Sequence, residues 1–561
     1  MKLIIKDYLS MMKESGELDE LLPNLLLSMG IKPVSKPQVG VRQFGVDVAS
    51  VGKDEDGVNK LFLFTIKQGN IGRRDWDQGK QAIRPSIEEI KDVYISTHIE
   101  PKYQKLPVKI VLCSGGEIKQ DTQMTWSNYV TNNSIENEVE YDFWGGDKLA
   151  LLIEEHLLDE NIFPSEVRRK FRKTLILIGE PDYNMYDYYS MLNDILFLQN
   201  LKKDSVKKIQ KKLMLINLSL NILLTWSRDA NNLKPVLLAS ERTILNIWGF
   251  LHENDLFSKK LLINDFVKIK KTYYDIAEEY FAKINPNLDV KNGLNLNSNH
   301  FILESKILFE HLGILSLFGL LVFSEGVLSQ EKNTFDHAKY VTQRIIILIK
   351  NHKTLLNPVL DSHIIDISLT ILLLSIHDEN EFINEWMYDL LQHIDFADKG
   401  FGKYIPISSD AIEDLIAFNM SDTKVKEEVF QTSILLPILA QWCVSLGLIQ
   451  NYKYIYELSN DMYKNTTLQI WYHDNDLEKY IYRTNAAYKC GLVEAPIVFP
   501  EQIKEYAEQM DKIKDKRFLD ENFSFMKEGV IFLALISSRH FRMPMLPLFW
   551  EPLIVEKKNK N

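Results

Sequence analysis

The sequence predicts an N-terminal α/β domain with a mixed sheet, followed by a large all-α region. Short apolar runs rich in β-branched and aromatic residues, which are typical of strands, lie within about the first 165 residues. From about residue 183, glycine and proline thin out, and long runs carry apolar residues at helical spacing. These two observations favour a sheet flanked by helices and then a helical region.

The N-terminal elements are expected in the order helix, strand, strand, helix, strand, strand, helix. The segments that predict them are LDELLPNLLLSMG (18–30), GVDVASV (45–51), KLFLFTIK (60–67), WDQGKQAIRPSIEEI (76–90), VKIVLCSGG (108–116), EVEYDFWGG (138–146) and DKLALLIEEHLL (147–158). The acidic GKDEDG between the first two strands is typical of a hairpin turn. Asp147 is expected to cap the last helix.

The region after residue 183 shows no strand alternation of any length and no fixed repeat period. One segment, VFQTSILLPILAQWCVSLGLI (429–449), carries no charge and is about as long as a membrane span. Polar residues such as Gln431 and Gln441 dilute it, so we expect a buried core helix and no membrane partner. The aromatic residues of this half are expected to pack in the core, although they could include a groove for a partner helix or peptide.

Composition restricts the classes of site that the chain can hold. The 561 residues carry a net charge of −11, so a nucleic-acid surface would have to be a local patch. Three cysteines, Cys113, Cys443 and Cys490, lie far apart, which argues against a zinc site and favours reduced thiols in the core of a cytoplasmic protein. The N-terminus lacks the apolar core of a signal peptide, because Lys6 and Asp7 interrupt it.

A basic segment connects the two parts of the chain. RRKFRK (168–173) and LKKDSVKKIQKK (201–212) hold eleven lysines and arginines against one acid, Asp204. The segment is either a solvated linker or helix face, or a patch that contacts phosphates. We therefore expect an α/β domain over residues 1–165, a basic connecting segment over 166–212, and an all-α region over 213–561.

The first two strands each carry a charged residue. A charge inside an apolar strand costs free energy unless it has a partner or a function. Asp47 lies on the first strand, and Lys67 ends the second, with a turn between them. Alternation along a strand puts Thr65 and Lys67 on one face, where both can look across the hairpin at the acid. A carboxylate that holds a divalent cation, beside an ammonium that orients water, is an arrangement that hydrolyses phosphodiesters. A structural ion pair across the hairpin is the alternative.

Together these segments resemble the PD-(D/E)XK restriction-endonuclease-like superfamily, and within it the Mrr-type branch. LDELLPNLLLSMG fits the spacing of the opening helix of that branch, with Asp19 at its acid and Glu20 beside it. FGVDVAS is similar to its glycine-x-aspartate strand at Asp47, and FTIKQG to its strand that ends in acid or glutamine, any residue, then lysine. KIVLCSGG and YDFWGGDKLALLI complete the order, so the resemblance covers about residues 15–160.

The resemblance implies a restriction-endonuclease-like fold and a DNA endonuclease that uses Mg (or Mn). Its metal would be held by Asp47 with Asp19 or Glu20, while Lys67 orients the attacking water. The helix after the lysine strand borders the nucleic-acid cleft in this fold, and basic residues there would meet phosphates. These residues are Arg73, Arg74, Lys80 and Arg84. A role in restriction or anti-phage defence, and a dimer, are further implications.

Thr65 stands where the family has its second acid, and three interpretations follow. Another acid can replace it, either Asp19 or Glu20 on the helix or one of the three acids at 54–56. Gln68 or Gln43 can replace the glutamine that some relatives use. Alternatively the site is inactive, and the chain is a nucleic-acid-binding and protein-interaction scaffold. RNA is a further possible substrate, because basic patches do not distinguish the sugars.

Overall fold

The computed structural model describes residues 2–34, 44–78, 82–157, 163, 165–180, 183–197, 205–295, 301–401, 405–408, 414, 430–473, 478, 481–483, 491–516, 523–544, 547 and 550. The chain divides into two compact units. Unit 1 comprises Met1–Ala239 and Lys259–Ile269, and unit 2 comprises Ser240–Ser258 and Lys270–Asn561. The division passes through two long helices, α11 (Lys234–Glu253) and α12 (Lys260–Ile284).

Unit 1 contains the mixed sheet that the sequence predicts. Its strands are β1 (Lys32–Pro33), β2 (Val48–Lys53), β3 (Asn59–Lys67), β4 (Val108–Ser114) and β5 (Val139–Trp144), in that order across the sheet. β1, β2 and β3 pair antiparallel, with Val48 opposite Phe64, whereas β3, β4 and β5 pair parallel. The expected hairpin of β2 and β3 is therefore confirmed, and its turn closes where Gly57 adopts a φ of 81°.

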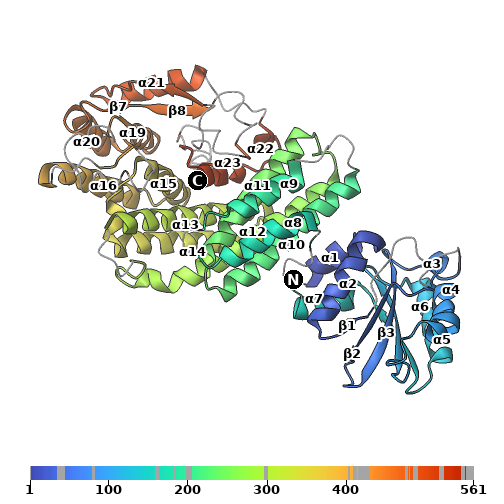
Figure 1. Cartoon of the computed structure of the whole chain (residues 1–561). Coiled ribbons are helices and arrows are strands. Elements are labelled where there is room, and N and C mark those ends of the chain that lie inside the picture. Colours follow the sequence, from blue (N-terminus) through green and yellow to red (C-terminus); the bar gives the residue numbers. More distant parts are fainter. Residues whose placement is uncertain are drawn as a thin grey trace. The chain divides into compact units, whose positions relative to one another are not determined.

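Helices cover both faces of this sheet (Figure 1). Before the strands come α1 (Lys2–Ser10), η1 (Glu14–Leu18) and α2 (Asp19–Ser28); between β3 and β4 come α3 (Arg73–Asp77), α4 (Ile83–Glu89), η2 (Ile90–Tyr94) and α5 (Ile95–Thr97); α6 (Gln120–Asn133) precedes β5, and α7 (Gly146–His156) follows it. Figure 1 shows α1, α2 and α7 on one side of the strands and α3 to α6 on the other.

Three expectations for this unit need correction. The single helix predicted over 76–90 is two helices, α3 and α4, because Gln78 is extended at the end of the first. Two helices, α1 and α6, were not predicted from the sequence. The cap of α7 is Gly145, whereas Asp147 lies in the first turn and accepts a hydrogen bond from Lys6 Nζ at 2.6 Å.

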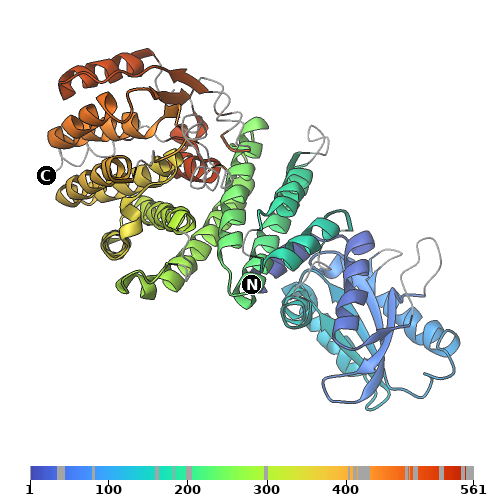
Figure 2. The ribbon, with the colours of Figure 1, turned by 60° about the vertical axis from the view of Figure 1, so that its left-hand side comes forward.

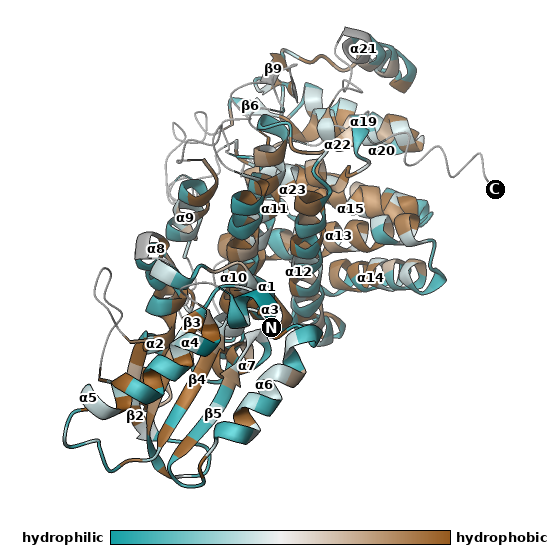
Figure 3. Ribbon diagram, turned by 90° about the vertical axis from the view of Figure 1, so that its right-hand side faces the viewer, coloured by the Kyte–Doolittle hydropathy of each residue, from teal (hydrophilic) through white to brown (hydrophobic). Residues whose placement is uncertain are grey.

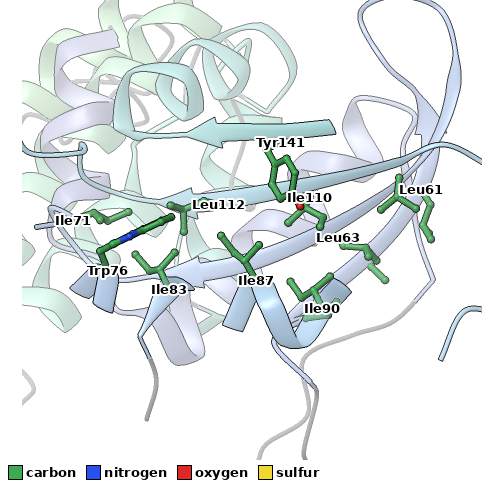
Figure 4. Packing of buried hydrophobic residues seen from close by; sticks show 13 residues of the cluster. Leu61, Leu63, Ile71, Trp76, Ile83, Ile87, Ile90, Ile110, Leu112 and Tyr141 are labelled. Atoms are coloured by element: carbon green, nitrogen blue, oxygen red, sulfur yellow. The ribbon is translucent and has the colours of Figure 1, made fainter. Parts of the chain in front are cut away.

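The core of unit 1 follows from strand alternation. β3 and β4 bury one set of alternate residues against α4 and the start of η2, where Ile83, Ile87 and Ile90 lie one helical turn apart. Figure 4 shows these isoleucines below Leu112 and Ile110, with Trp76 at one end of the cluster and Tyr141 from β5 above. Figure 3 shows the same strands in the brown of apolar residues and α6 largely in teal.

Two glycines let the loop after β4 lie against its neighbours. A Cβ on Gly115 would come within 2.1 Å of the Leu9 carbonyl oxygen of α1. A Cβ on Gly116 would come within 2.4 Å of the Gly69 backbone after β3. The Ser114 hydroxyl fixes the same contact by donating to the Gly69 carbonyl at 2.5 Å. The end of β3, the end of β4 and α1 are thereby held in one compact junction.

Helices make up most of the rest of the chain. After α7 come α8 (Ser165–Leu177), α9 (Tyr186–Phe197), α10 (Val206–Asp229), α11 and α12; then η5 (Asn285–Asp289), α13 (Phe301–Ser329), α14 (Lys332–Asn351), η6 (Lys353–Leu356), η7 (Asp361–His363), α15 (Ile364–Ile376), α16 (Asn380–Phe401), α19 (Leu435–Leu446), α20 (Ile449–Asn460), α21 (Ile503–Lys516), α22 (Ser524–Lys527) and α23 (Phe532–Phe541). The mostly helical character is confirmed. Figure 2 shows α13 to α16, coloured yellow to orange, stacked against one another.

The helical region is not purely α. Two small pairs of strands interrupt it, β6 (Thr432–Ser433) with β7 (Thr467–Leu468), and β8 (Ile470–His473) with β9 (Gly491–Glu494). These pairs were not predicted, because strands of two to four residues are too short to show alternation.

Apolar segments of unit 2 lie in its interior. Within the predicted core segment 429–449, α19 buries every residue from Leu435 to Cys443, as expected. One described helix, α13, is long and apolar enough to cross a membrane, but 72% of its most apolar window is buried in the structure. Burial on this scale is what a core helix shows. Cys113 and Cys443 are free and buried, as predicted, whereas Cys490 lies outside the described residues.

Shortening a core side chain of the sheet tests this packing. Ile110→Ala removes a fully buried side chain from β4, and we expect a loss of about 2–5 kcal/mol, because the cavity forfeits contacts as well as burial. Hydrogen exchange should accelerate in β3 and β4. Ile176→Ala on α8, where the isoleucine is 69% exposed, is the matched control and should change exchange little. Equal protection of the strands in both variants would contradict the packing.

Candidate active site at the end of β3

Polar residues gather where β3 leaves the sheet. β3 is apolar from Leu61 to Phe64 and then continues with Thr65, Ile66 and Lys67. Thr65 is 1% exposed, and the Lys67 side chain is 16% exposed. The Lys67 ammonium lies 3.7 Å from Oε1 of Glu14, in η1. The end of β3 thus places the Lys67 ammonium beside the half-buried carboxylate of Glu14.

Asp47 is fixed at the same place by the backbone of β3. It lies one residue before β2, and its N–H donates to the Phe64 carbonyl at 2.8 Å. Its Oδ2 accepts a hydrogen bond from the Ile66 N–H at 2.6 Å. These two bonds hold the Asp47 carboxylate just beyond the β2–β3 ladder, which ends at Val48 opposite Phe64. The side chain therefore points to the end of β3, as the hairpin predicts.

Burial raises the pKa of the Asp47 carboxyl to about 6. The hydrogen bond from Ile66 and the positive charge of Lys67 act in the opposite direction and lower it. The negative charges of Glu14 and Asp19 raise it further. Lys67 forms no ion pair with Asp47 within 4.0 Å, so the structural ion pair considered as an alternative is not a direct contact. Three carboxylates and one ammonium nevertheless share one electrostatic neighbourhood.

Asp19 has an unused carboxylate oxygen. It is the first residue of α2, where the helix dipole favours a negative charge. Its Oδ1 is buried, and it has no hydrogen-bond partner among the described residues. Such an atom normally costs free energy unless a cation or water satisfies it. Glu20, the next residue, is exposed instead, so of the two helical acids Asp19 is the one brought to Asp47.

The donor set suits a hard cation. Carboxylate oxygens are the ligands that Mg²⁺ and Mn²⁺ prefer, and Mg²⁺ usually takes only one or two of them, with water for the rest. Within the described residues, no group of three or more His, Cys, Asp or Glu side chains stands ready to hold a metal. The fit therefore rests on Asp47 and the unsatisfied oxygen of Asp19.

The acids of the hairpin turn lie elsewhere. Asp54 to Asp56 follow β2 at the end of the hairpin opposite to Asp47, about 20 Å away along the extended strand. They are also occupied. Asp54 and Asp56 bind the Lys60 ammonium at 2.9 and 2.6 Å, and Glu55 lies 3.3 Å from Lys148. The hypothesis that one of them replaces the family's second acid is wrong for this geometric reason.

The predicted phosphate contacts are only partly available. Arg73 and Arg74 are exposed on α3, shortly after the lysine strand. Arg84 is exposed on α4, but its guanidinium already binds Glu88 at 3.1 Å and lies 3.8 Å from Asp77. Lys80 lies outside the described residues, as does Gln43. Arg73 and Arg74 are thus the better candidates for positioning a phosphate backbone.

Glu14 was not among the residues predicted from the sequence. This residue precedes a turn in which Gly16 adopts a φ of 79° and Ser15 is extended, so the chain reverses between α1 and α2. The reversal brings Glu14 to Lys67 and Asp47, which no periodic pattern could reveal. The available signal is local, an acid followed by Ser-Gly directly before a helix that itself begins with two acids.

The arrangement offers two groups that phosphodiester hydrolysis uses, a carboxylate and an ammonium. With a pKa of about 6, Asp47 is mostly ionised at neutral pH and can bind a cation or accept a proton. Lys67 supplies a positive charge at a place where negative charge would develop on a phosphate. Thr65 contributes only a buried hydroxyl, which is a weak metal ligand.

Comparison with known proteins adds no relative. No family model matches the chain, and neither a curated protein nor a solved structure does. The likeness to the PD-(D/E)XK superfamily therefore stays a hypothesis, which rests on the order of the segments and on the residues gathered at the end of β3.

The raised pKa of Asp47 predicts a specific pH dependence of stability. Between about pH 4 and pH 6 the folded state binds the Asp47 proton and the unfolded state does not, so stability falls as pH rises. Asp47→Asn removes this loss and should stabilise the chain at pH 7 by at most about 3 kcal/mol. Melting temperatures of both proteins should converge near pH 4 and separate above pH 6. A difference that stays constant with pH would contradict the assignment.

Proposed function

We propose that this chain is a metal-dependent endonuclease that hydrolyses phosphodiester bonds in DNA. One observation carries the proposal. The buried and unsatisfied Oδ1 of Asp19 lies in the charge neighbourhood of Asp47 and Lys67, at the end of a strand that is otherwise apolar. Buried charges of this kind are costly to stability and are common at catalytic sites. The order of segments that resembles the Mrr-type branch supports the same conclusion.

The residues divide the chemistry among them. Asp47 and Asp19 would hold Mg (or Mn), which when bound polarises a phosphoryl oxygen and makes water more acidic. Lys67 orients the attacking water and neutralises charge that develops on the phosphate. Glu14 holds the Lys67 ammonium at 3.7 Å, so that the lysine is directed before substrate arrives. Arg73 and Arg74 would contact the backbone without reading bases.

Thr65 favours a second candidate function. A buried threonine in the place of the second motif acid leaves the cation with fewer carboxylates than active relatives provide. The chain would then keep the nuclease scaffold to bind nucleic acid, and the helical region would bind a protein partner or a second copy. A role in restriction or anti-phage defence is compatible with both candidates and rests on the resemblance alone.

A cleavage assay separates the two candidates. We expect the full-length protein to cut plasmid and linear DNA in the presence of Mg or Mn, and Lys67→Ala to lower the rate by a factor on the order of 10² to 10³, because it removes charge stabilisation at the reacting phosphate. The products are measured on gels over time. An RNA of the same sequence tests the third substrate class.

Lys53→Ala is the control for this assay. Lys53 ends β2 at the other end of the same hairpin and is exposed, so its loss should leave cleavage unchanged. If the wild type retains DNA in a gel shift but never cuts it with either metal, the scaffold function is correct and the endonuclease is not.

Metal binding should also be visible without activity. Excess Mg or Mn should raise the melting temperature of the wild type, since a ligand at a hundred times its Kd adds about 2.7 kcal/mol of stability. Asp19→Asn and Asp47→Asn should each abolish the shift. Glu136→Gln, which removes an exposed acid before β5, should preserve it. A shift that persists in both aspartate variants would place the cation elsewhere.

A further inference from the structure

A cavity of about 980 Å³ opens beside the candidate active site, within unit 1. Its lining comes from the α1–η1–α2 segment, from the helices α8 to α10, and from Gln68 directly after β3. Gln68 and Glu20 belong to the lining, and they directly follow Lys67 and Asp19 in the sequence. The cavity therefore adjoins the polar cluster at the end of β3.

Lysines dominate the charge of this cavity. Five of them line it: Lys13, Lys207, Lys208, Lys211 and Lys212. Three acids, Glu17, Glu20 and Asp194, share the lining, which leaves a local charge of +2 on a chain whose net charge is −11. Two of these acids are already paired. Glu17 binds Lys211, and Asp194 binds Lys170, which stands outside the lining.

The lysines of α10 form a short tract. Lys207 and Lys211 lie four residues apart, as do Lys208 and Lys212, so they make two adjacent rows on the helix surface. The tract rises about 7.5 Å along the axis from first to last lysine. Ser205 caps this helix by accepting a hydrogen bond from the Lys208 N–H at 3.3 Å, which fixes the first turn. Two rows of ammonium groups match an extended polyanion better than a compact one.

The rest of the lining suits a nucleic-acid strand. Apolar side chains also line the cavity, among them Met11, Ile195 and Leu215, and they can contact sugars and bases. Lys211 is held in the wall, with a side chain only 19% exposed, and Lys207 and Lys208 are exposed at the rim. A positively charged groove is the feature that follows the phosphate backbone in proteins that bind single strands without sequence preference.

We propose that this cavity binds a single strand of the nucleic acid and leads it from the cleavage centre onto α10. The inference rests on the proposed function and extends it, because the lysines at the start of α10 belong to the basic connecting segment and not to the sheet with its covering helices. The helices that follow the sheet thereby form part of the protein surface that binds the substrate.

Binding is tested in the full chain with Lys67→Ala, so that no DNA is cut. Fluorescence anisotropy of a labelled single-stranded oligonucleotide gives Kd over a series of salt concentrations. Lys207→Gln/Lys208→Gln should raise Kd on the order of tenfold and lower the slope of log Kd against log salt by about 1.4, since each lost phosphate contact contributes about 0.7. Both residues are exposed, so the fold should persist.

Lys332→Gln/Lys339→Gln is the matched control. It removes two exposed lysines from α14 in unit 2 and changes the net charge of the chain by the same amount. The control should leave Kd and the salt slope unchanged. An equal loss in both variants would show that net charge and not the tract governs binding, and no loss in the first would show that the strand does not enter the cavity. Either result overturns the inference.

Two further measurements separate this inference from the proposed function. In the otherwise wild-type chain, Lys207→Gln/Lys208→Gln should raise the KM for DNA cleavage and leave kcat unchanged. Cleavage with an unchanged KM would refute the strand path but not the endonuclease. If the chain never cuts but binds the oligonucleotide through Lys207 and Lys208, the endonuclease is refuted and the strand path is not. If a fluorescent ATP analogue binds through the same lysines and the oligonucleotide does not, the cavity takes a compact anion and the inference fails.

Discussion

The candidate site depends on the attachment of Asp47 to the backbone of β3. One N–H of the strand, that of Ile66, donates to the Asp47 carboxylate, and one carbonyl, that of Phe64, accepts from the Asp47 N–H. Both bonds use groups that a strand at the end of its ladder would otherwise leave unpaired. The acid is therefore positioned by the same hydrogen bonds that finish the sheet. The other three charged residues of the cluster can act together with Asp47 only because its carboxylate is held in place. They are Lys67, Glu14 and Asp19.

The charges gathered at the end of β3 lower the stability of the folded state. Asp47 is desolvated, two further carboxylates stand near it, and a single ammonium compensates them. Elsewhere in the same unit, buried charges are matched closely. Lys60, whose side chain is 3% exposed, has carboxylate oxygens of Asp54, Asp56 and Glu140 all within 2.9 Å. Unit 1 therefore holds a satisfied charge network and an unsatisfied one, a hairpin length apart, and charges of the second kind are common at catalytic sites.

Much of unit 1 could be predicted because its elements leave periodic signals. β3 and β4 are apolar runs between turn residues, α2 and α7 have clear apolar faces, and their order fixed a mixed sheet. α6 escaped because it is polar almost throughout, with Thr122 as its only fully buried residue. Asp47 and Lys67 were found from the cost of charge in a strand, whereas Glu14 depends on a reversal of the chain that only the folded backbone reveals. The cavity lysines were noticed as a basic run, but their partner wall in α1 and η1 is nearly two hundred residues away in sequence.

The junction after β4 has a consequence for how this chain can evolve. Gly115 and Gly116 lie so close to the backbones of Leu9 and Gly69 that even a methyl group would collide with main-chain atoms, which cannot rotate away as a side chain can. Exposed side chains of the same unit can be exchanged without such a collision. The glycine pair has no such freedom. In diverged homologues, two adjacent glycines downstream of the lysine strand would therefore persist longer than the acidic motif, and they offer the more durable mark of common descent.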